Sequence, residues 1–180
     1  WPQALPDKKP ASDAPAFLCL FHYACFIKPT RRQPMAVNHQ WDVIAPFHID
    51  VTVAASDIDR LDHVNNAAYL RFMERAAWAH TEALGLTWET YRALDAACVV
   101  RRHEIDYLAA AHIDQPLRIA TWIESNDQRL AMWRRFQIRR DLTGATIFRA
   151  ATQYVTITLS NGRPRRMPRE FAEAYRVHDG

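Results

Sequence analysis

The stretch Ser56–Gly85, SDIDRLDHVNNAAYLRFMERAAWAHTEALG, decides how the rest of the chain can be interpreted. Its first part places three aspartates and a histidine within the seven residues from Asp57 to His63. This segment is too polar for a buried strand and predicts a loop. The residues that follow are spaced like one face of a helix, which we expect to begin near Asn66 and to end at Gly85.

The helix is predicted from the spacing of its apolar side and from its first residues. Asn65 and Asn66 both have side chains that suit an N-cap. The loop therefore leads directly into a helix N-terminus, where free N–H groups and the helix dipole favour negative charge. Such a junction suits an oxyanion site with a carboxylate beside it. The side chains expected on the buried face recur at steps of three and four residues: Tyr69, Phe72 or Met73, Ala76, His80, and Ala83 or Leu84.

The motif D-x-D-x-x-x-H-V-N-N-x-x-Y-L-x-x-x-E, from Asp57 to Glu74, resembles the signature of hotdog-fold acyl thioesterases. The similarity is to the 4-hydroxybenzoyl-CoA thioesterase and bacterial acyl-CoA thioesterase group, and it extends from about Trp41 to about Tyr175. It implies an α+β fold in which an antiparallel sheet wraps around a long central helix. It also implies a homodimer or homotetramer with active sites at the subunit interface.

The remaining elements are predicted from alternation and composition, and they fit that architecture. One strand precedes the helix and four follow it, as in an α+β layer fold. The strand at Cys98–Tyr107 is the least regular, because apolar and charged side chains share one parity. We expect short helices at Thr87–Leu94 and Pro168–Arg176, and strands within Val43–Val53, Cys98–Tyr107, Leu117–Ile123, Leu130–Arg139 and Ile147–Leu159.

Composition divides the chain near Met35. All three lysines lie within residues 1–34, whereas the remaining body has eighteen arginines and eighteen acids. We therefore expect residues 1–34 to be a poorly ordered or extraneous leader and residues 35–180 to form one domain. The longest apolar run, Ala14–Ile27, is shorter than the roughly 20 residues that a membrane-spanning helix needs. The three cysteines have no metal-binding spacing, and reduced thiols favour a cytoplasmic protein without a metal site.

The second half of the chain is rich in arginine. Ten arginines and one acid, Asp141, lie between Arg129 and Arg169. A phosphate-bearing thioester such as acyl-CoA would use a few of them at a pocket mouth, and Arg134 and Arg135 are our candidates. Solvated strand faces are the alternative explanation. Nucleic-acid binding is disfavoured, because the body has no net charge and no recognised nucleic-acid module.

Thioester hydrolysis needs a carboxylate, acting as nucleophile or as general base, and hydrogen-bond donors for the carbonyl oxygen. The family resemblance places the catalytic acid on Asp59, although an aspartate here could also simply cap a turn. His63 could orient the acid or donate to the substrate. Asn65 and Asn66 could cap the helix, hold the loop or donate to the thioester oxygen.

Four side chains of the predicted helix have open roles. Glu74 is a second candidate acid, although a structural bond is the favoured interpretation. Tyr69 and Phe72 could line the acyl pocket or pack in the core, and His80 is expected to be a buried, hydrogen-bonded histidine.

The sequence therefore predicts an acyl-CoA thioesterase that releases free acid and CoA and needs no cofactor, because CoA is part of the substrate. A non-catalytic protein that binds acyl thioesters is an alternative. A hotdog dehydratase of 3-hydroxyacyl thioesters is disfavoured, because the D-x-N-P-x-H motif is missing between Asp59 and His63. The acyl group is left open.

Overall fold

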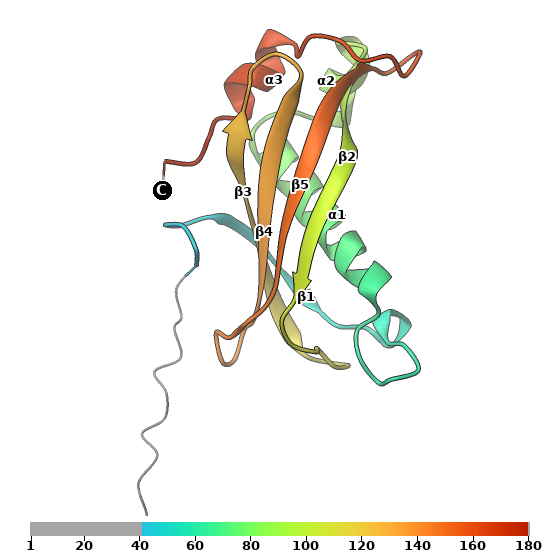
Figure 1. Cartoon of the computed structure of the whole chain (residues 1–180), viewed down its shortest axis with the longest axis vertical. Helices are drawn as coiled ribbons and strands as arrows, with labels where there is room; N and C mark the ends of the chain where they lie inside the picture. Colours follow the sequence, from blue (N-terminus) through green and yellow to red (C-terminus); the bar gives the residue numbers. More distant parts are fainter. Residues whose placement is uncertain (1–40, 180) are drawn as a thin grey trace, which may run out of the picture. The chain divides into compact units, whose positions relative to one another are not determined.

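The computed structural model describes residues 41–179 (Figure 1). The predictions made for the leader, including Cys19 and Cys25, lie outside these residues. Within the described part of the chain, no helix is long and apolar enough to cross a membrane. The elements are β1 (Phe47–Thr52), a 3-10 turn (Ala55–Asp57), α1 (Asn66–Ala83), α2 (Trp88–Ala93), β2 (Ala96–Tyr107), β3 (Pro116–Asn126), β4 (Ala131–Arg140), β5 (Thr146–Thr158) and α3 (Arg169–Ala174).

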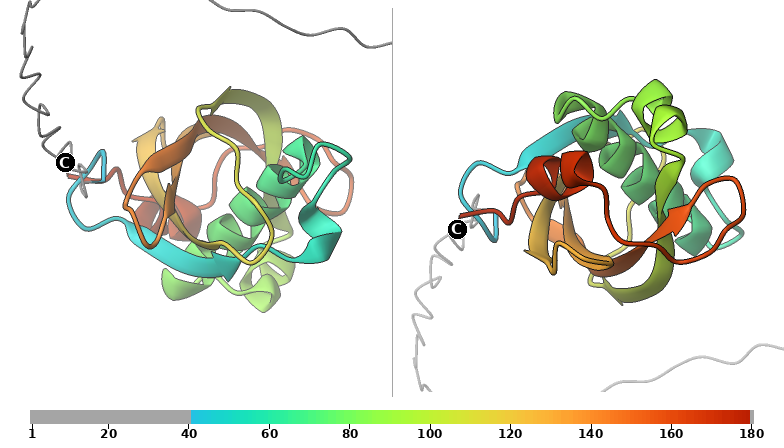
Figure 2. Two further views of the ribbon diagram at one scale, coloured as in Figure 1. Left: turned by 90° about the horizontal axis from the view of Figure 1, so that it is seen from below. Right: turned by 90° about the horizontal axis from the view of Figure 1, so that it is seen from above.

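The five strands form one antiparallel sheet in the order β1-β3-β4-β5-β2. Viewed along its length, the sheet curves around α1, as both panels of Figure 2 show. The predicted α+β hotdog architecture, one long helix held within a curved antiparallel sheet, is confirmed. The order and type of every predicted element within the described residues are also confirmed, with ends that move by a few residues.

Helix α1 begins and ends where its sequence predicts. Asn65 is the N-cap, and its side-chain oxygen accepts a hydrogen bond from the Ala67 amide at 2.8 Å. At the other end Gly85 has a φ of +82°, a left-handed conformation that favours glycine and stops the helix.

The core lies between α1 and the concave face of the sheet. Ala68 and Ala76 are completely buried on the helix, opposite Ile119 and Ile138 of the sheet, which are also completely buried. Short side chains on α1 allow the curved sheet to approach it closely. The helix is thereby fixed along its length, and with it the loop that precedes its N-terminus.

Strand β2 contains an irregularity that explains its mixed pattern. The pairing with β5 shifts between Val100 and Arg102, so Arg101 is an extra residue that forms a bulge. A bulge reverses the parity of the side chains beyond it. Consequently Cys98 and Val100 before the bulge, and His103 after it, line the same cavity.

The outward side of β4 is less exposed than its polar residues suggest. Gln137 is completely buried and Arg139 is 5% exposed. The backbone amide of Asp42 donates to the Gln137 side chain at 2.9 Å, and the Arg139 guanidinium lies over the Trp41 ring at 4.7 Å. The segment before β1 therefore covers this part of the sheet.

A second cluster of buried side chains lies near α2 and α3. Phe171 and Tyr175 are 0% and 1% exposed, and they pack with Tyr91 of α2 and Met132 of β4. The Tyr175 hydroxyl is hydrogen-bonded to those of Tyr91, at 2.5 Å, and Thr81, at 3.0 Å. The C-terminal helix thus closes the sheet beside the C-terminal half of α1.

Candidate active site

The acidic loop is a compact turn fixed by its own backbone. Ile58 and Val64 form an isolated antiparallel bridge, and the Asp59 amide donates to the His63 carbonyl at 2.8 Å. Asp62 closes the turn with a φ of +58°, and its amide donates to the Asp59 carbonyl at 3.2 Å. The loop therefore holds Asp59 and His63 in a defined position ahead of α1.

Asp57 has a structural role. Its side chain is largely buried, accepts a hydrogen bond from the Ala54 amide at 3.1 Å and forms an ion pair with Arg71 at 2.8 Å. Its carbonyl also accepts from the Asn65 amide at 2.8 Å. These contacts tie the loop to the first two turns of α1.

Asp59 is partly exposed at the turn of the loop. Its Oδ1 accepts a hydrogen bond from the Leu61 amide at 2.8 Å. Among the described residues, Oδ2 has no hydrogen-bond partner. The carboxylate is therefore oriented by one oxygen, while the other is available to a ligand or a water molecule.

A second histidine, His112, lies beside His63, although no local sequence motif indicates it. The rings of His63 and His112 meet edge to face, with their centroids 5.1 Å apart. Nδ1 of His112 is 2.9 Å from the Asp62 carbonyl oxygen, and the Val64 amide donates to the Ala111 carbonyl at 2.9 Å. The segment between β2 and β3 therefore buttresses the acidic loop through contacts between residues distant in sequence.

The two asparagines have different positions. The side-chain oxygen of Asn65 accepts a hydrogen bond from the Ala67 amide, and its backbone carbonyl accepts one from the Ala68 amide at 2.8 Å. Asn65 is therefore the residue that caps the helix. Asn66 is the first residue of α1 and is exposed, and within residues 41–179 no acceptor is bonded to its amide. The Asn66 backbone amide is therefore the first-turn N–H group that could donate a hydrogen bond to an oxyanion.

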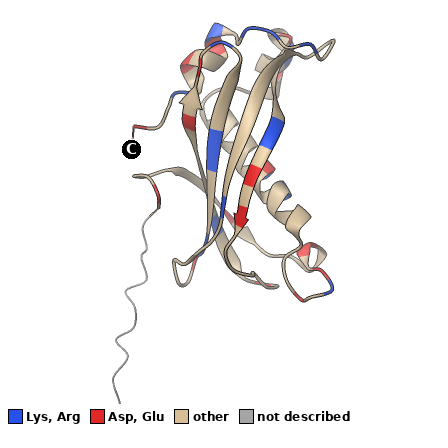
Figure 3. Ribbon diagram, in the orientation of Figure 1, with Lys and Arg blue, Asp and Glu red and all other residues tan. Residues whose placement is uncertain are grey.

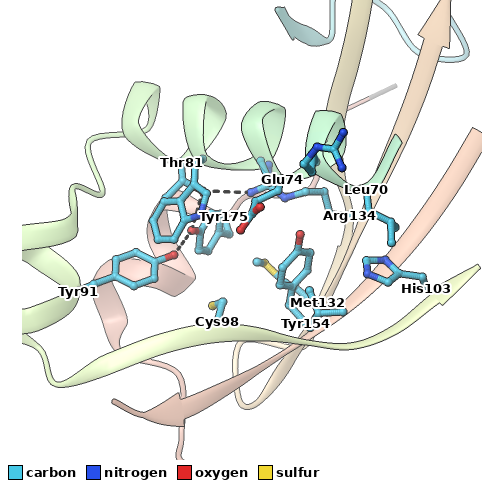
Figure 4. Close-up of a pocket in the computed structure, with 14 residues that line it drawn as sticks. Leu70, Glu74, Thr81, Tyr91, Cys98, His103, Met132, Arg134, Tyr154 and Tyr175 are labelled. Carbon is cyan, nitrogen blue, oxygen red and sulfur yellow. Dashed lines mark hydrogen bonds between the residues drawn. The ribbon is translucent and has the colours of Figure 1, made fainter. Parts of the chain in front are cut away.

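A cavity of about 380 Å³ runs along α1, between this helix and strands β2, β4 and β5 (Figure 4). Since the lining residues of α1 extend from Leu70 to Thr81, the helix follows the cavity for about 16 Å, at 1.5 Å per residue. The lining is largely apolar and aromatic, and consists of Leu70, Arg71, Glu74, Ala77, Trp78, Thr81, Tyr91, Cys98, Val100, His103, Met132, Arg134, Tyr154 and Tyr175.

Arg134 has a position that differs from the prediction. We expected it at a pocket mouth, but it is 1% exposed and points into the cavity beside Thr81 and Tyr175 (Figure 4). On β4 it shares its parity with Met132 and Phe136, so the alternation of the strand already placed it inward. Arg135 faces the other side, where it forms an ion pair with Glu124 at 2.6 Å.

Tyr69 and Phe72 pack in the core and do not line the cavity. They are 3% and 2% exposed, and the Tyr69 ring stacks on Phe148 with centroids 4.9 Å apart. Burial raises the pKa of the Tyr69 hydroxyl. Of the two roles left open for these residues, packing in the core is the one that their burial and ring contacts support.

Glu74 lines the cavity from the middle of α1. We expected a structural bond to backbone or to arginine, but its carboxylate has no hydrogen bond or ion pair with any described residue. It is the one acid among the described residues that line the cavity. Glu74 thus has the exposure and the surroundings of a carboxylate that is available to a ligand.

His80 is the hydrogen-bonded histidine that the sequence predicted. Its Nδ1 accepts a hydrogen bond from Arg134 at 3.0 Å, and its ring stacks on Phe47 with centroids 4.9 Å apart. Burial and the positive charge of Arg134 lower the pKa of His80 to about 4. The imidazole is therefore neutral at physiological pH and serves as an acceptor.

Most of the arginine-rich second half has partners within the protein. Within Arg129–Arg169, Arg135 pairs with Glu124 at 2.6 Å, Arg149 with Asp42 at 2.7 Å and Arg169 with Glu173 at 2.6 Å. In Figure 3 basic and acidic segments are interspersed over the strands, and no single basic stripe crosses them. These partly to largely exposed pairs favour the alternative explanation, solvated faces, for part of the arginine content.

Comparison with known proteins places the chain in a family. The sequence profile of the thioesterase-like superfamily matches residues 53–175. Protein THEM6 of Danio rerio is 32% identical over 105 residues, which make up 58% of this chain and 46% of that protein. The chain thus spans about half the length of the curated relative that it matches.

Solved structures show the same fold. YbaW, a probable thioesterase from Escherichia coli, is 25% identical with a TM-score of 0.63, over 71% of this chain and 95% of that one. Slr0204, a 1,4-dihydroxy-2-naphthoyl-CoA thioesterase from Synechocystis, is 20% identical with a TM-score of 0.65, over 72% and 94%. The curved sheet around α1, the acidic loop before it and the profile match agree: this chain belongs to the thioesterase-like superfamily.

Proposed function

We propose that this protein hydrolyses an acyl-CoA thioester to a free carboxylic acid and CoA. The observation that carries the proposal is the largely apolar cavity along α1. One of its lining residues, Arg71, forms an ion pair with Asp57 of the acidic loop, so the cavity lies next to that loop. An acyl chain in this cavity would place its thioester toward the loop and the N-terminus of α1. Membership of the thioesterase-like superfamily supports the same chemistry.

In this mechanism Asp59 acts on the thioester carbonyl, either directly as a nucleophile or as a general base that deprotonates water. Its open Oδ2 suits both roles, and the Leu61 amide orients the carboxylate. The Asn66 amide and the positive end of the α1 dipole would stabilise the developing oxyanion. His63, with His112 against it, would orient the acid or donate to the substrate.

Glu74 is a second candidate for the catalytic acid. The favouring observation is that it lines the cavity without a partner, whereas Asp59 is not a lining residue. If Glu74 performs the reaction, the thioester would lie midway along α1 instead of at its N-terminus. Replacing each acid by its amide distinguishes the two positions.

A panel of acyl-CoA esters of graded chain length, assayed by trapping the released thiol, tests the proposal. Hydrolysis of at least one ester is expected, with a length optimum set by the cavity. Binding of acyl-CoA without thiol release across the whole panel would contradict hydrolysis and would favour the non-catalytic binding protein. No dependence on acyl length would contradict the role of the cavity.

A further inference from the structure

The inner end of the cavity contains a positive charge that no carboxylate balances. The Arg134 side chain is 1% exposed, and it forms no ion pair with any residue in the described part of the chain. An arginine guanidinium stays charged in proteins, and burial of a charge is costly unless it is paired. Such a group requires an explanation beyond packing.

The contacts of Arg134 leave part of its hydrogen-bonding capacity unused. Nη1 donates to His80 Nδ1 at 3.0 Å and Nη2 to Thr81 Oγ1 at 3.4 Å, while the guanidinium lies over the Tyr175 ring, 5.6 Å from its centroid. Nε is buried without a partner. All three protein contacts are to neutral groups, and together they position the guanidinium without neutralising it.

The charge is placed where the far end of a bound chain would lie. Thr81 and Tyr175, which touch Arg134, line the cavity toward the C-terminal end of α1, whereas Leu70 and Arg71 line it toward the acidic loop. Figure 4 shows Arg134 reaching in from β4, with Met132 and Tyr154 along the adjacent wall. A chain whose thioester lies near the loop would therefore direct its other end toward Arg134.

We propose that the natural substrate is an acyl thioester whose acyl chain carries a carboxylate at its far end, and that Arg134 binds this carboxylate. The inference rests on the proposed thioesterase function and specifies its substrate class. Arginine is suited to this task, because its planar donors match a carboxylate in a bidentate arrangement. The apolar walls would bind the methylene chain, so both charge and length would be selected.

Glu74 is the lining acid that could compete for Arg134. No ion pair joins the two side chains. Glu74 is exposed, whereas Arg134 is buried. Glu74 would disfavour a second negative charge near the middle of the chain. The far end beside Arg134 is therefore the place where the cavity accepts an anion.

The kinetic test compares wild-type kcat/KM for succinyl-, glutaryl-, adipoyl- and suberoyl-CoA with that for the plain acyl-CoA ester of the same carbon number. At the best length we expect the carboxylate-bearing ester to be favoured at least about tenfold, as for a charged hydrogen bond. Arg134→Met should abolish this preference, Arg134→Lys should retain part of it, and the surface control Arg149→Met should keep it. Melting temperatures show that each variant is folded.

A binding test separates this inference from the proposed function. Calorimetry of wild-type protein with octanoate and octanamide should show tighter binding of octanoate, and Arg134→Met should remove the difference. If no ester is hydrolysed but this difference is present, the proposed function fails and carboxylate recognition by Arg134 stands. Equal kcat/KM for both ester series in the wild type overturns the substrate assignment, and equal binding of octanoate and octanamide overturns the carboxylate site.

Discussion

At the scale of single residues, the contact between Arg134 and His80 explains how a histidine occupies the inner side of α1. Arg134 donates to Nδ1 of His80, which requires a neutral imidazole with its proton on Nε2. Burial, and after it the nearby positive charge of Arg134, disfavour the protonated form and lower the pKa of His80. The same contact holds the guanidinium at the inner end of the cavity.

His80 should make the stability of the protein dependent on pH. Its pKa is about 4 in the folded protein and 6.5 in a model peptide, so the unfolded state takes up the proton first as the pH falls. Its contribution is fully present above about pH 6.5 and is lost as the pH falls toward 4. After allowance for partial exposure this amounts to roughly 2 kcal/mol.

Urea unfolding of the wild type and His80→Gln from pH 7.5 to pH 4 measures this effect. Glutamine retains an acceptor for Arg134 but does not titrate, so the stability of the variant should fall less over that range. Parallel curves for the two proteins would contradict the assignment.

Asp57 and Asp59 lie two residues apart in the same loop but should respond differently to loss of charge. Asp57→Asn weakens the ion pair with Arg71 and the cap on the Ala54 amide, and we expect a loss of about 1 kcal/mol in the free energy of unfolding. Asp59→Asn keeps the acceptor for the Leu61 amide and should hardly change the free energy of unfolding. Denaturant midpoints of the two variants provide the comparison, and equal losses would contradict these roles.

At the scale of elements, the junction between the acidic loop and α1 combines a cap with a free donor. Asn65 satisfies two first-turn amides, while the Asn66 amide is left for an anion. The positive end of the helix dipole and the free Asn66 amide therefore lie together at the N-terminus of α1, where both favour a bound anion. The segment before β3 holds that point through His112 and Ala111.

The two asparagines provide a matched pair for testing this junction. Asn65→Ala should lower the free energy of unfolding by about 1 kcal/mol, because it removes the N-cap. Asn66→Ala should change it by less than about 0.5 kcal/mol, because the side chain is exposed and the backbone amide remains. Thermal unfolding of both variants measures the difference, and the reverse order would assign the cap to Asn66.

The sequence was sufficient for those parts of the fold that local pattern determines. Helix α1 and the turns at Gly144 and Gly162 follow from residue spacing and from these glycines, which adopt a positive φ. The bulge at Arg101 was not predicted, although the mixed parity of β2 was its signature. Alternation cannot be followed through a strand whose period changes within it.

The site was less predictable, because contacts between distant residues define it. His112 reaches the acidic loop from fifty residues away in sequence, and no local motif indicates it. Arg134 could have been placed inward from the parity of β4, but its charge favoured an exposed position. The cavity walls formed by β2, β4 and β5 exist only after the sheet has closed on α1.

At the scale of the whole domain, residues 41–179 contain two clusters of buried side chains that hold the sheet to its helices. The first packs α1 against β1, β3, β4 and β5, and the second packs α2 and α3 against the sheet beside the far end of the cavity. The cavity borders Tyr91 and Tyr175 of the second cluster. Stability of the C-terminal helix and integrity of the cavity should therefore be linked.

Phe171→Ala tests this link. The side chain is completely buried, so its truncation should cost about 3 to 5 kcal/mol and should weaken acyl-CoA binding by loosening the cavity wall. Leu142→Ala, at an 82% exposed position, is the control and should change neither property. Chemical denaturation and acyl-CoA binding measure the two effects. If Phe171→Ala lowers stability but leaves acyl-CoA binding unchanged, the packing of α3 does not support the cavity.

The assignment of the catalytic acid is tested by the rate of thiol release from the best acyl-CoA in wild type, Asp59→Asn and Glu74→Gln. We expect Asp59→Asn to lower kcat by about a hundredfold or more, as for loss of a general base or nucleophile, with an unchanged melting temperature. Glu74→Gln should retain most of the activity. If Asp59→Asn is fully active, the chemistry is not at the acidic loop. If Asp59→Asn is active and Glu74→Gln is inactive, Glu74 is the catalytic acid instead.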